Sequence, residues 1–183
     1  YCGYIDSNTL RAGYPESKRC GEALCQAYKK QENLDVVIPR FTRSYGPTML
    51  KTDTKAISQF IKKAVDGENI VLKSAGTQYY SYTYVADAVA GFLTVLLKGE
   101  SGEAYNIADE ASDIMLKDLA KIIADFASKE VVFELPDETE KAGYSKATKA
   151  RLDGSKLKKL GWNARYDIKQ GLERTMKMLT EIS

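Results

Sequence analysis

The order of the first two elements, a helical pattern that leads directly into a β-branched run, constrains the fold more than any other feature. Pro15 is well placed as a first helical residue, and apolar side chains then recur at helical spacing to about Asn33. The run 35–40, DVVIPR, is typical of a parallel strand, and residues 44–47, SYGP, are expected to form the turn that leaves it. We therefore expect a buried helix and a strand that continue an α/β sheet begun before Tyr1.

The remaining chain alternates between helical and strand patterns. Helices are expected over residues 54–65, 85–97, 116–127, 155–160 and 168–179, and strands over 70–72, 79–82, 104–108 and 131–135. Residues 136–148 have no apolar periodicity, which predicts a surface loop. The fold class is therefore α/β, with a small mixed lobe after the first strand.

Composition and charge exclude several classes of protein. The chain has 183 residues, of which 44% are apolar and 28% charged, as in an ordinary globular domain. A formal net charge of +2 gives no reason to expect a nucleic-acid partner. No apolar run approaches the roughly 20 residues of a membrane helix, and the first residues do not resemble a signal peptide. We interpret the chain as cytoplasmic, with no membrane partner.

Cysteine and histidine usage narrows the possible chemistry. Three cysteines without a Cys-x-x-Cys pair predict neither a disulfide framework nor a zinc site, and no metal is expected. The chain has no histidine, which removes Ser-His-Asp and Cys-His catalysis and the commonest general base. Any proton transfer must use tyrosine, lysine, aspartate or glutamate.

Tyr14 and Lys18 form a candidate proton-transfer pair. Residues four apart on a helix share a face, so the ammonium can favour the ionised phenol and let it act as a base. The lysine can also donate hydrogen bonds to a cofactor ribose. The spacing alone carries little weight, because chance predicts about one such pair in a chain this rich in both residues.

Five segments, in order, give the pair its context. The first is Tyr14-Pro15-Glu16-Ser17-Lys18-Arg19 with Glu22, and the others are residues 40–47 (RFTRSYGP), 76–87 (GTQYYSYTYVAD), 105–107 (YNI) and 153–162 (DGSKLKKLGW). Together they resemble the extended short-chain dehydrogenase/reductases, specifically the NAD-dependent nucleotide-sugar epimerases, dehydratases and decarboxylases. The matches are spread over nearly the whole chain.

The resemblance implies a fold, a cofactor and a substrate. Residues 1–48 would be the last part of a Rossmann-like parallel sheet carrying the Tyr-x-x-x-Lys helix, and residues 49–183 the lobe that binds a nucleotide-diphosphate sugar. In the intact parent, NAD oxidises a sugar carbon while Tyr14 removes the hydroxyl proton. Lys18 would tune Tyr14 and hold the nicotinamide ribose, and Phe41 and Thr42 would pass close to nicotinamide and sugar.

Four cationic or aromatic residues depart from the family pattern or have two interpretations. Arg43 stands where the family has asparagine, and it is either a cation that grips phosphate or a sugar carboxylate, or a surface arginine. Tyr80 stands where an arginine is expected at the pyrophosphate. Lys149 and Arg151 are candidate phosphate ligands, or part of a solvated basic face.

The sequence contains no Gly-x-x-Gly-x-x-Gly phosphate loop. We therefore expect that an N-terminal NAD-binding segment is missing, and that this chain alone binds NAD poorly and does not turn over. Relatives of this family commonly dimerise through the Tyr-x-x-x-Lys helix, so a homodimer is a further expectation.

Two alternatives stay open: a non-catalytic binding module that retains the fold, and a globular domain with accidental matches. The choice among epimerase, dehydratase and decarboxylase is also open.

Overall fold

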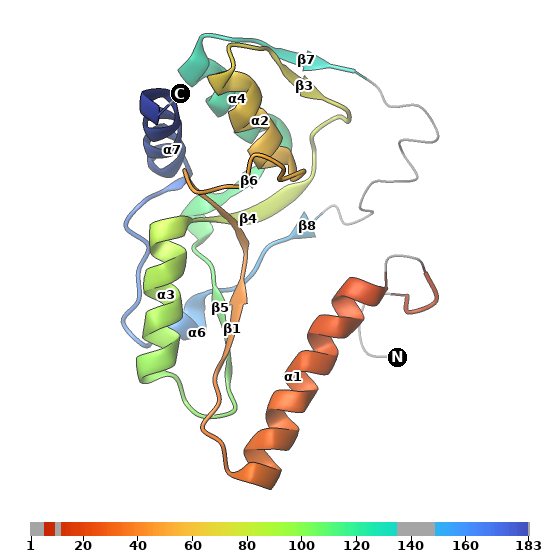
Figure 1. Ribbon diagram of the computed structural model, residues 1–183, viewed down its shortest axis with the longest axis vertical. Helices are drawn as coiled ribbons and strands as arrows, with labels where there is room; N and C mark the ends of the chain where they lie inside the picture. Colours follow the sequence, from red (N-terminus) through yellow and green to blue (C-terminus); the bar gives the residue numbers. More distant parts are fainter. Residues whose placement is uncertain (1–5, 10–11, 135–148, 183) are drawn as a thin grey trace.

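The computed structural model (Figure 1) describes residues 6–9, 12–134 and 149–182. The helices are α1 (Gly13–Glu32), α2 (Ala56–Val65), α3 (Val85–Lys98), α4 (Leu116–Ala127), α6 (Ser155–Lys158) and α7 (Ile168–Ile182), with a 3₁₀ turn η1 (Glu110–Ser112). The strands are β1 (Ile38–Phe41), β2 (Arg43–Tyr45), β3 (Ile70–Leu72), β4 (Tyr79–Tyr84), β5 (Ala104–Ile107), β6 (Asp113–Met115), β7 (Val131–Phe133) and β8 (Lys149–Ala150). The alternation of helices and strands confirms the predicted α/β fold.

Most strand pairs are parallel and join segments that are distant in sequence. β1 pairs with β5, β2 with β4, β3 with β7, and β8 with β4, all in parallel. The one antiparallel pair of the described sheets joins β4 to β6. Strand β1 lies before residue 48 and pairs with β5, which lies after it. The predicted division of the chain into residues 1–48 and 49–183 stays a prediction.

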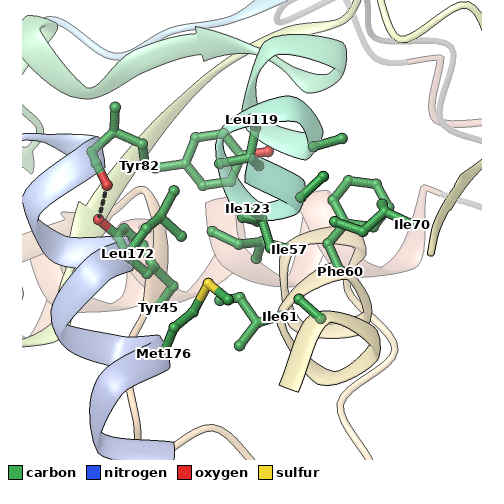
Figure 2. Packing of buried hydrophobic residues seen from close by; sticks show 14 of the residues in the cluster. Tyr45, Ile57, Phe60, Ile61, Ile70, Tyr82, Leu119, Ile123, Leu172 and Met176 are labelled. Atoms are coloured by element: carbon green, nitrogen blue, oxygen red, sulfur yellow. Dashed lines mark hydrogen bonds between the residues drawn. The ribbon is translucent and has the colours of Figure 1, made fainter. Parts of the chain in front are cut away.

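The main hydrophobic core lies in the lobe formed by α2, α4, α7, β3 and β4. Figure 2 shows side chains from these elements meeting in one layer, and Ile61, Leu119 and Leu172 are fully buried there. Tyr45, at the end of β2, enters the same core and its Oη donates a hydrogen bond to the Ile168 carbonyl at 3.2 Å. The amphipathic patterns of these helices therefore find their apolar partners within the chain.

A smaller core lies between α3, β5 and α6, around Trp162. The Trp162 indole donates to the Asp87 carbonyl at 3.3 Å, and the Asp87 carboxylate accepts hydrogen bonds from the backbone amides of Arg165 and Tyr166. The Asn106 side chain donates to the Asp153 carbonyl at 2.9 Å. These motif residues therefore hold the C-terminal segment onto the β1–β5 pair.

Helix α1 forms where expected, but the expectation that it is buried is wrong. It carries no buried residue, and Leu24 and Tyr28 are about half exposed. Figure 1 shows α1 and α3 on either side of the β1–β5 pair. Polar contacts tether the C-terminal half of α1, including a two-bond pair from Arg40 to Glu22 at 2.7 and 2.5 Å. A sheet of two strands is too narrow to cover the apolar face of a 20-residue helix.

Helix α3 also leaves an apolar face uncovered. Its exposed stripe, called the α3 stripe below, recurs at helical spacing and consists of Val89, Phe92, Leu93, Leu96 and Leu97. Phe41 of β1 extends it, with its ring 6.3 Å from that of Phe92. The edge of β1 opposite β5 has no strand partner among the described residues. One side of this region is therefore apolar and open.

Several sequence expectations need correction. Ser44 and Tyr45, expected at the start of the turn 44–47, belong to strand β2, because residues 43–45 pair with Tyr82–Tyr84 of β4. The short strands β6 and β8 were not expected, and both take their register from β4. The predicted loop 136–148 lies outside the described residues. No helix within the described ranges has the length and apolarity needed to span a membrane.

Candidate functional site

A cavity of about 660 Å³ opens between β4, the start of α2 and the end of β3. Its floor is apolar and its rim is polar. The lining residues are Arg43, Thr54, Lys55, Ala56, Ile57, Phe60, Val71, Leu72, Lys73, Ser74, Gln78, Tyr80, Tyr82 and Leu116. This size and this mixture of apolar wall and convergent polar groups are typical of a small-molecule site.

The electrostatic character of the cavity is positive. Arg43, Lys55 and Lys73 line it, whereas none of the lining residues that the structure describes carries a carboxylate. Lys55 is also the N-cap of α2, so the positive end of the helix dipole lies at the cavity wall. Asp53 restrains Lys55 through an ion pair of 3.2 Å. The cavity is therefore suited to an anionic ligand with an apolar or aromatic part.

Arg43 and Tyr80 lie in direct contact. The guanidinium carbon of Arg43 is 3.6 Å from the centroid of the Tyr80 ring, and the tyrosine is 8% exposed. Strand register explains the contact, because Arg43 of β2 is paired with Tyr82 of β4, and Tyr80 lies two residues earlier on the same face. Two of the four residues predicted to bind substrate are thus brought together in one cavity.

Two further groups give the cavity wall its chemistry. The Gln78 Oε1 atom is buried and has no hydrogen-bond partner in the described structure, so a ligand N–H group can satisfy it. Burial raises the pKa of Tyr82 to about 12, although the nearby Arg43 charge lowers it, so Tyr82 stays neutral. Gln78 therefore offers a ligand a hydrogen-bond acceptor, and Tyr82 adds a side chain that carries no charge.

The predicted catalytic pair lies on α1. Lys18 Nζ is 5.4 Å from the centroid of the Tyr14 ring, so the structure brings the two side chains together. Tyr14 is 74% exposed, and neither residue lines the described cavity. The pair is accessible to a ligand, and the described part of the chain builds no enclosure around it.

Phe41 and Thr42, predicted to lie near nicotinamide and sugar, connect β1 to β2. Phe41 is exposed against the α3 stripe, as described above. The Thr42 hydroxyl shares a 2.5 Å hydrogen bond with the Thr83 hydroxyl, which also donates to the Ile107 carbonyl. Thr42 therefore holds β2 and β4 at the point where the chain leaves β1.

Lys149 and Arg151 lie on the other face of β4. β8 pairs with β4 so that Lys149 is opposite Tyr79, and the Arg151 guanidinium lies 5.2 Å from the Tyr79 ring. Arg151 also approaches Asp113 at 3.9 Å, and burial raises the pKa of this carboxyl group. Neither of the two cations is part of the cavity lining.

Sequence reasoning missed three cavity residues: Lys55, Lys73 and Gln78. Gln78 was part of a recognised motif but received no role, and the lysines lie outside every motif. Only the packing of α2 and β3 beside β4 brings them to one place. Their signal in the sequence is no stronger than that of the other lysines and amides of the chain, most of which are expected at the surface.

Comparison with known proteins decides the family. Residues 5–108 match the model of the NAD dependent epimerase/dehydratase family. This chain belongs to that family. The matched range covers the Tyr14–Lys18 pair, β1, β2 and the strand that carries Tyr80. The resemblance inferred from the five segments is confirmed.

Two relatives whose names state an enzyme activity align with almost the whole of this chain. It is 30% identical over 173 residues to UDP-glucuronic acid decarboxylase 6 of Arabidopsis thaliana, covering 94% of this chain and 49% of the relative. It is 29% identical over 177 residues to UDP-glucuronic acid decarboxylase 1 of Danio rerio, covering 96% of this chain and 41% of the relative. The chain spans about half the length of the curated relatives it matches.

Solved structures show the same fold. The UDP-glucose 4-epimerase of Thermotoga maritima, solved with UDP-glucose, matches with a TM-score of 0.81 at 23% identity, over 92% of this chain and 53% of that one. The UDP-glucuronic acid 4-epimerase of Bacillus cereus, in complex with UDP-glucuronic acid and NAD, matches with a TM-score of 0.81 at 22% identity. The match covers 100% of this chain and 58% of that one. The α/β architecture of this family is thus present in the chain.

The described residues do not fit a complete NAD molecule. Tyr14 and Lys18 offer a hydroxyl and an ammonium on an open helix face, and the Thr42 hydroxyl is already bonded to Thr83. The sequence contains no glycine-rich loop to accept a pyrophosphate. Among the described elements, none encloses a dinucleotide beside Tyr14, so we derive no step through the cofactor.

Proposed function

We propose that this chain forms the nucleotide-sugar-binding portion of an NAD-dependent nucleotide-sugar epimerase, dehydratase or decarboxylase. The observation that carries the proposal is the cavity between β4, α2 and β3, whose described lining has three cations and no carboxylate. Its apolar floor is suited to the base, and its cations to the diphosphate. Of the residues predicted from the sequence to bind substrate, Arg43 and Tyr80 lie in it, while Lys149 and Arg151 would act from the opposite face of β4.

Tyr14 and Lys18 are the proposed catalytic residues. Tyr14 would remove the proton from a sugar hydroxyl, and the ammonium of Lys18, 5.4 Å from the ring, would stabilise the tyrosinate. Lys18 also has donors for a ribose, and Phe41 and Thr42 would lie beside it. NAD supplies hydride chemistry in the whole enzyme, and this chain would contribute the proton transfer and the substrate site.

The uncovered face of the molecule supports a further NAD-binding segment in the whole protein. The α3 stripe, Phe41 and the open edge of β1 lie together, and α1 lacks an apolar covering. A contiguous exposed apolar surface of this kind usually marks an interaction site. We propose that the NAD-binding segment adds strands to β1 and covers these helices, and that the isolated chain binds NAD weakly and is inactive.

The substrate would be a UDP sugar with an acidic sugar group. UDP-glucuronic acid decarboxylases are among the curated relatives that match almost the whole chain. Arg43 stands in the cavity, where a guanidinium can bind a carboxylate or a phosphate through paired N–H donors. Lys55 and Lys73 line the same cavity, so a glucuronate carboxylate as well as the diphosphate would have a cation near it.

Calorimetric titration of the chain with UDP, dTDP, CDP and GDP sugars, and with NAD, tests the proposal. We expect UDP-glucuronic acid to bind more tightly than UDP-glucose and NAD to bind weakly. Tyr14→Phe is the matched control, because it removes the proton-transfer group without touching the cavity, and its nucleotide-sugar affinity should be unchanged. Failure of every sugar nucleotide to bind would contradict the proposal, and steady-state turnover by the isolated chain would contradict its inactive part.

A non-catalytic binding module is the second candidate. Tyr80, a neutral residue at the expected pyrophosphate position, and the absence of an enclosure around Tyr14 among the described residues both favour it. Supplying the chain with the NAD-binding half of a UDP-glucuronic acid decarboxylase distinguishes the two candidates. Turnover that is lost in Tyr14→Phe would support the enzyme, and a stable complex without turnover would support the module.

A further inference from the structure

We propose that Tyr80 is a positioning residue whose buried ring holds the Arg43 guanidinium as the principal anion-binding group of the cavity. This inference rests on the proposed function, because it names the groups that would bind the diphosphate. It assigns Tyr80 a role through Arg43, in place of a direct role at the ligand.

The geometry of the contact supports this role. With its central carbon 3.6 Å from the ring centroid, the Arg43 guanidinium lies over the face of the Tyr80 ring. Stacking uses the face of the planar cation and leaves the N–H groups at its edge available as donors. The edge is the part of a guanidinium that binds phosphate in paired hydrogen bonds. The stack therefore orients the cation without consuming its donors.

Tyr80 is itself rigidly placed. Its strand has neighbours on both sides, since Tyr80 is paired with Ile114 of β6 and with Ala150 of β8. The residue is 8% exposed and belongs to the main core. A ring fixed in this way lowers the conformational freedom that Arg43 would lose on binding an anion.

Arg43 differs from a neighbouring cation of the same cavity. Lys55 is held by the Asp53 carboxylate at 3.2 Å, so part of its charge is already compensated. No carboxylate of the described chain forms an ion pair with Arg43. The charge of Arg43 is therefore available to a ligand, and its support comes from an aromatic ring.

The experiment measures the affinities of the chain for UDP and for inorganic pyrophosphate by calorimetry. We expect Arg43→Gln to weaken both by roughly tenfold or more, and Tyr80→Leu to weaken both by about fivefold. Tyr80→Phe, which keeps the ring, should retain the affinity of the wild-type chain. Arg43→Lys keeps the charge but loses the planar stack, so its affinity should fall toward that of Arg43→Gln.

A double variant separates positioning from a structural role. If Tyr80 acts through Arg43, adding Tyr80→Leu to Arg43→Gln should cause no further loss of affinity. A further fivefold loss in the double variant would overturn the proposal, as would full affinity in Tyr80→Leu. If Tyr80→Leu does not fold, wild-type affinity in Arg43→Lys or lost affinity in Tyr80→Phe would overturn it instead.

The two ligands keep this inference distinct from the proposed function. Equal affinity for UDP and pyrophosphate, with the expected losses in the variants, would support the Tyr80–Arg43 pair and contradict nucleotide binding. Tight UDP binding that is unaffected by Arg43→Gln would support nucleotide binding and overturn the pair. Absence of binding to either ligand would overturn both.

Discussion

Two regions of the molecule differ in how far their apolar side chains are buried. One is the lobe that contains α2, α4, α7 and β4, and the other contains α1, β1, β5 and α3. In the lobe, the apolar faces of the helices meet one another, and residues such as Ile61 and Leu119 are fully buried. In the other region, α1 has no buried residue and the α3 stripe is exposed. The lobe is therefore a complete core, whereas the other region presents an apolar surface.

Helix α3 shows both conditions on a single element. Val95 is fully buried against Ile107 and Trp162, while Leu97, two residues later, is 78% exposed. Both faces are apolar, which is expected of a helix buried on all sides. The comparison teaches that an apolar pattern identifies a surface to be covered, but it does not say whether the same chain covers it.

The largest test of this comparison deletes buried volume in each region. Ile61→Ala should lower the free energy of unfolding by about 2–5 kcal/mol, because it leaves a cavity in the lobe core. Leu97→Ala, the matched control on α3, should change it by less than about 0.5 kcal/mol. Urea unfolding of both variants measures the difference. Similar losses in the two variants would mean that the α3 stripe is covered.

A smaller effect should come from adding a methyl group at a helix glycine in each region. A Cβ at Gly171 of α7 would clash with the Tyr45 hydroxyl, so Gly171→Ala should destabilise the chain by about 1–3 kcal/mol. A Cβ at Gly21 of α1 meets no atom within 4 Å, so Gly21→Ala should stabilise the helix by up to about 1 kcal/mol. Thermal unfolding and the helical circular dichroism signal would reveal the opposite signs. A loss in both variants would show that α1 is closely packed.

The smallest expected effect concerns the tether of α1. The hydrogen bonds from Arg40 lower the pKa of Glu22 below its ordinary value of 4.5. The folded carboxylate is thus favoured, and its contribution, about 0.2–1 kcal/mol for an exposed pair, is present above pH 4.5 and lost as the pH falls through the lowered pKa. The protection factors of the α1 amides, which compare their hydrogen exchange with that of unprotected amides at the same pH, measure this dependence between pH 3 and 6. In Glu22→Gln these protection factors should vary less with pH. The same pH profile in the variant and in the wild-type chain would argue against the tether.

Local sequence signals predicted most elements correctly. Helical periodicity predicted α4 at Leu116–Ala127, and a short β-branched run predicted β3 at Ile70–Leu72. Strands β6 and β8 were missed because neither has a β-branched run like that of β3, and each forms only against β4. Short strands of this kind are specified by their neighbour and not by their own sequence.

The candidate site was predictable only in part. Tyr14 and Lys18 are four residues apart on one helix, so their proximity follows from helical geometry alone. Arg43 and Tyr80 are far apart in sequence, and their contact depends on the pairing of β2 with β4. The sequence pattern placed the second half of β2 in a turn and so did not predict this pairing. Gln78 and Lys73 became part of the site through the packing of α2 and β3 beside β4.

The sequence by itself determined the α/β class, the family and the helix that carries Tyr14 and Lys18. It did so because periodicity, turn residues and motif spacing are local properties of the chain. Only the tertiary structure decided that α1 and the α3 stripe are uncovered, that Lys149 and Arg151 lie away from the cavity, and that Arg43 lies against the Tyr80 ring. These features depend on which distant strands pair, and strand pairing is set by packing over the whole molecule.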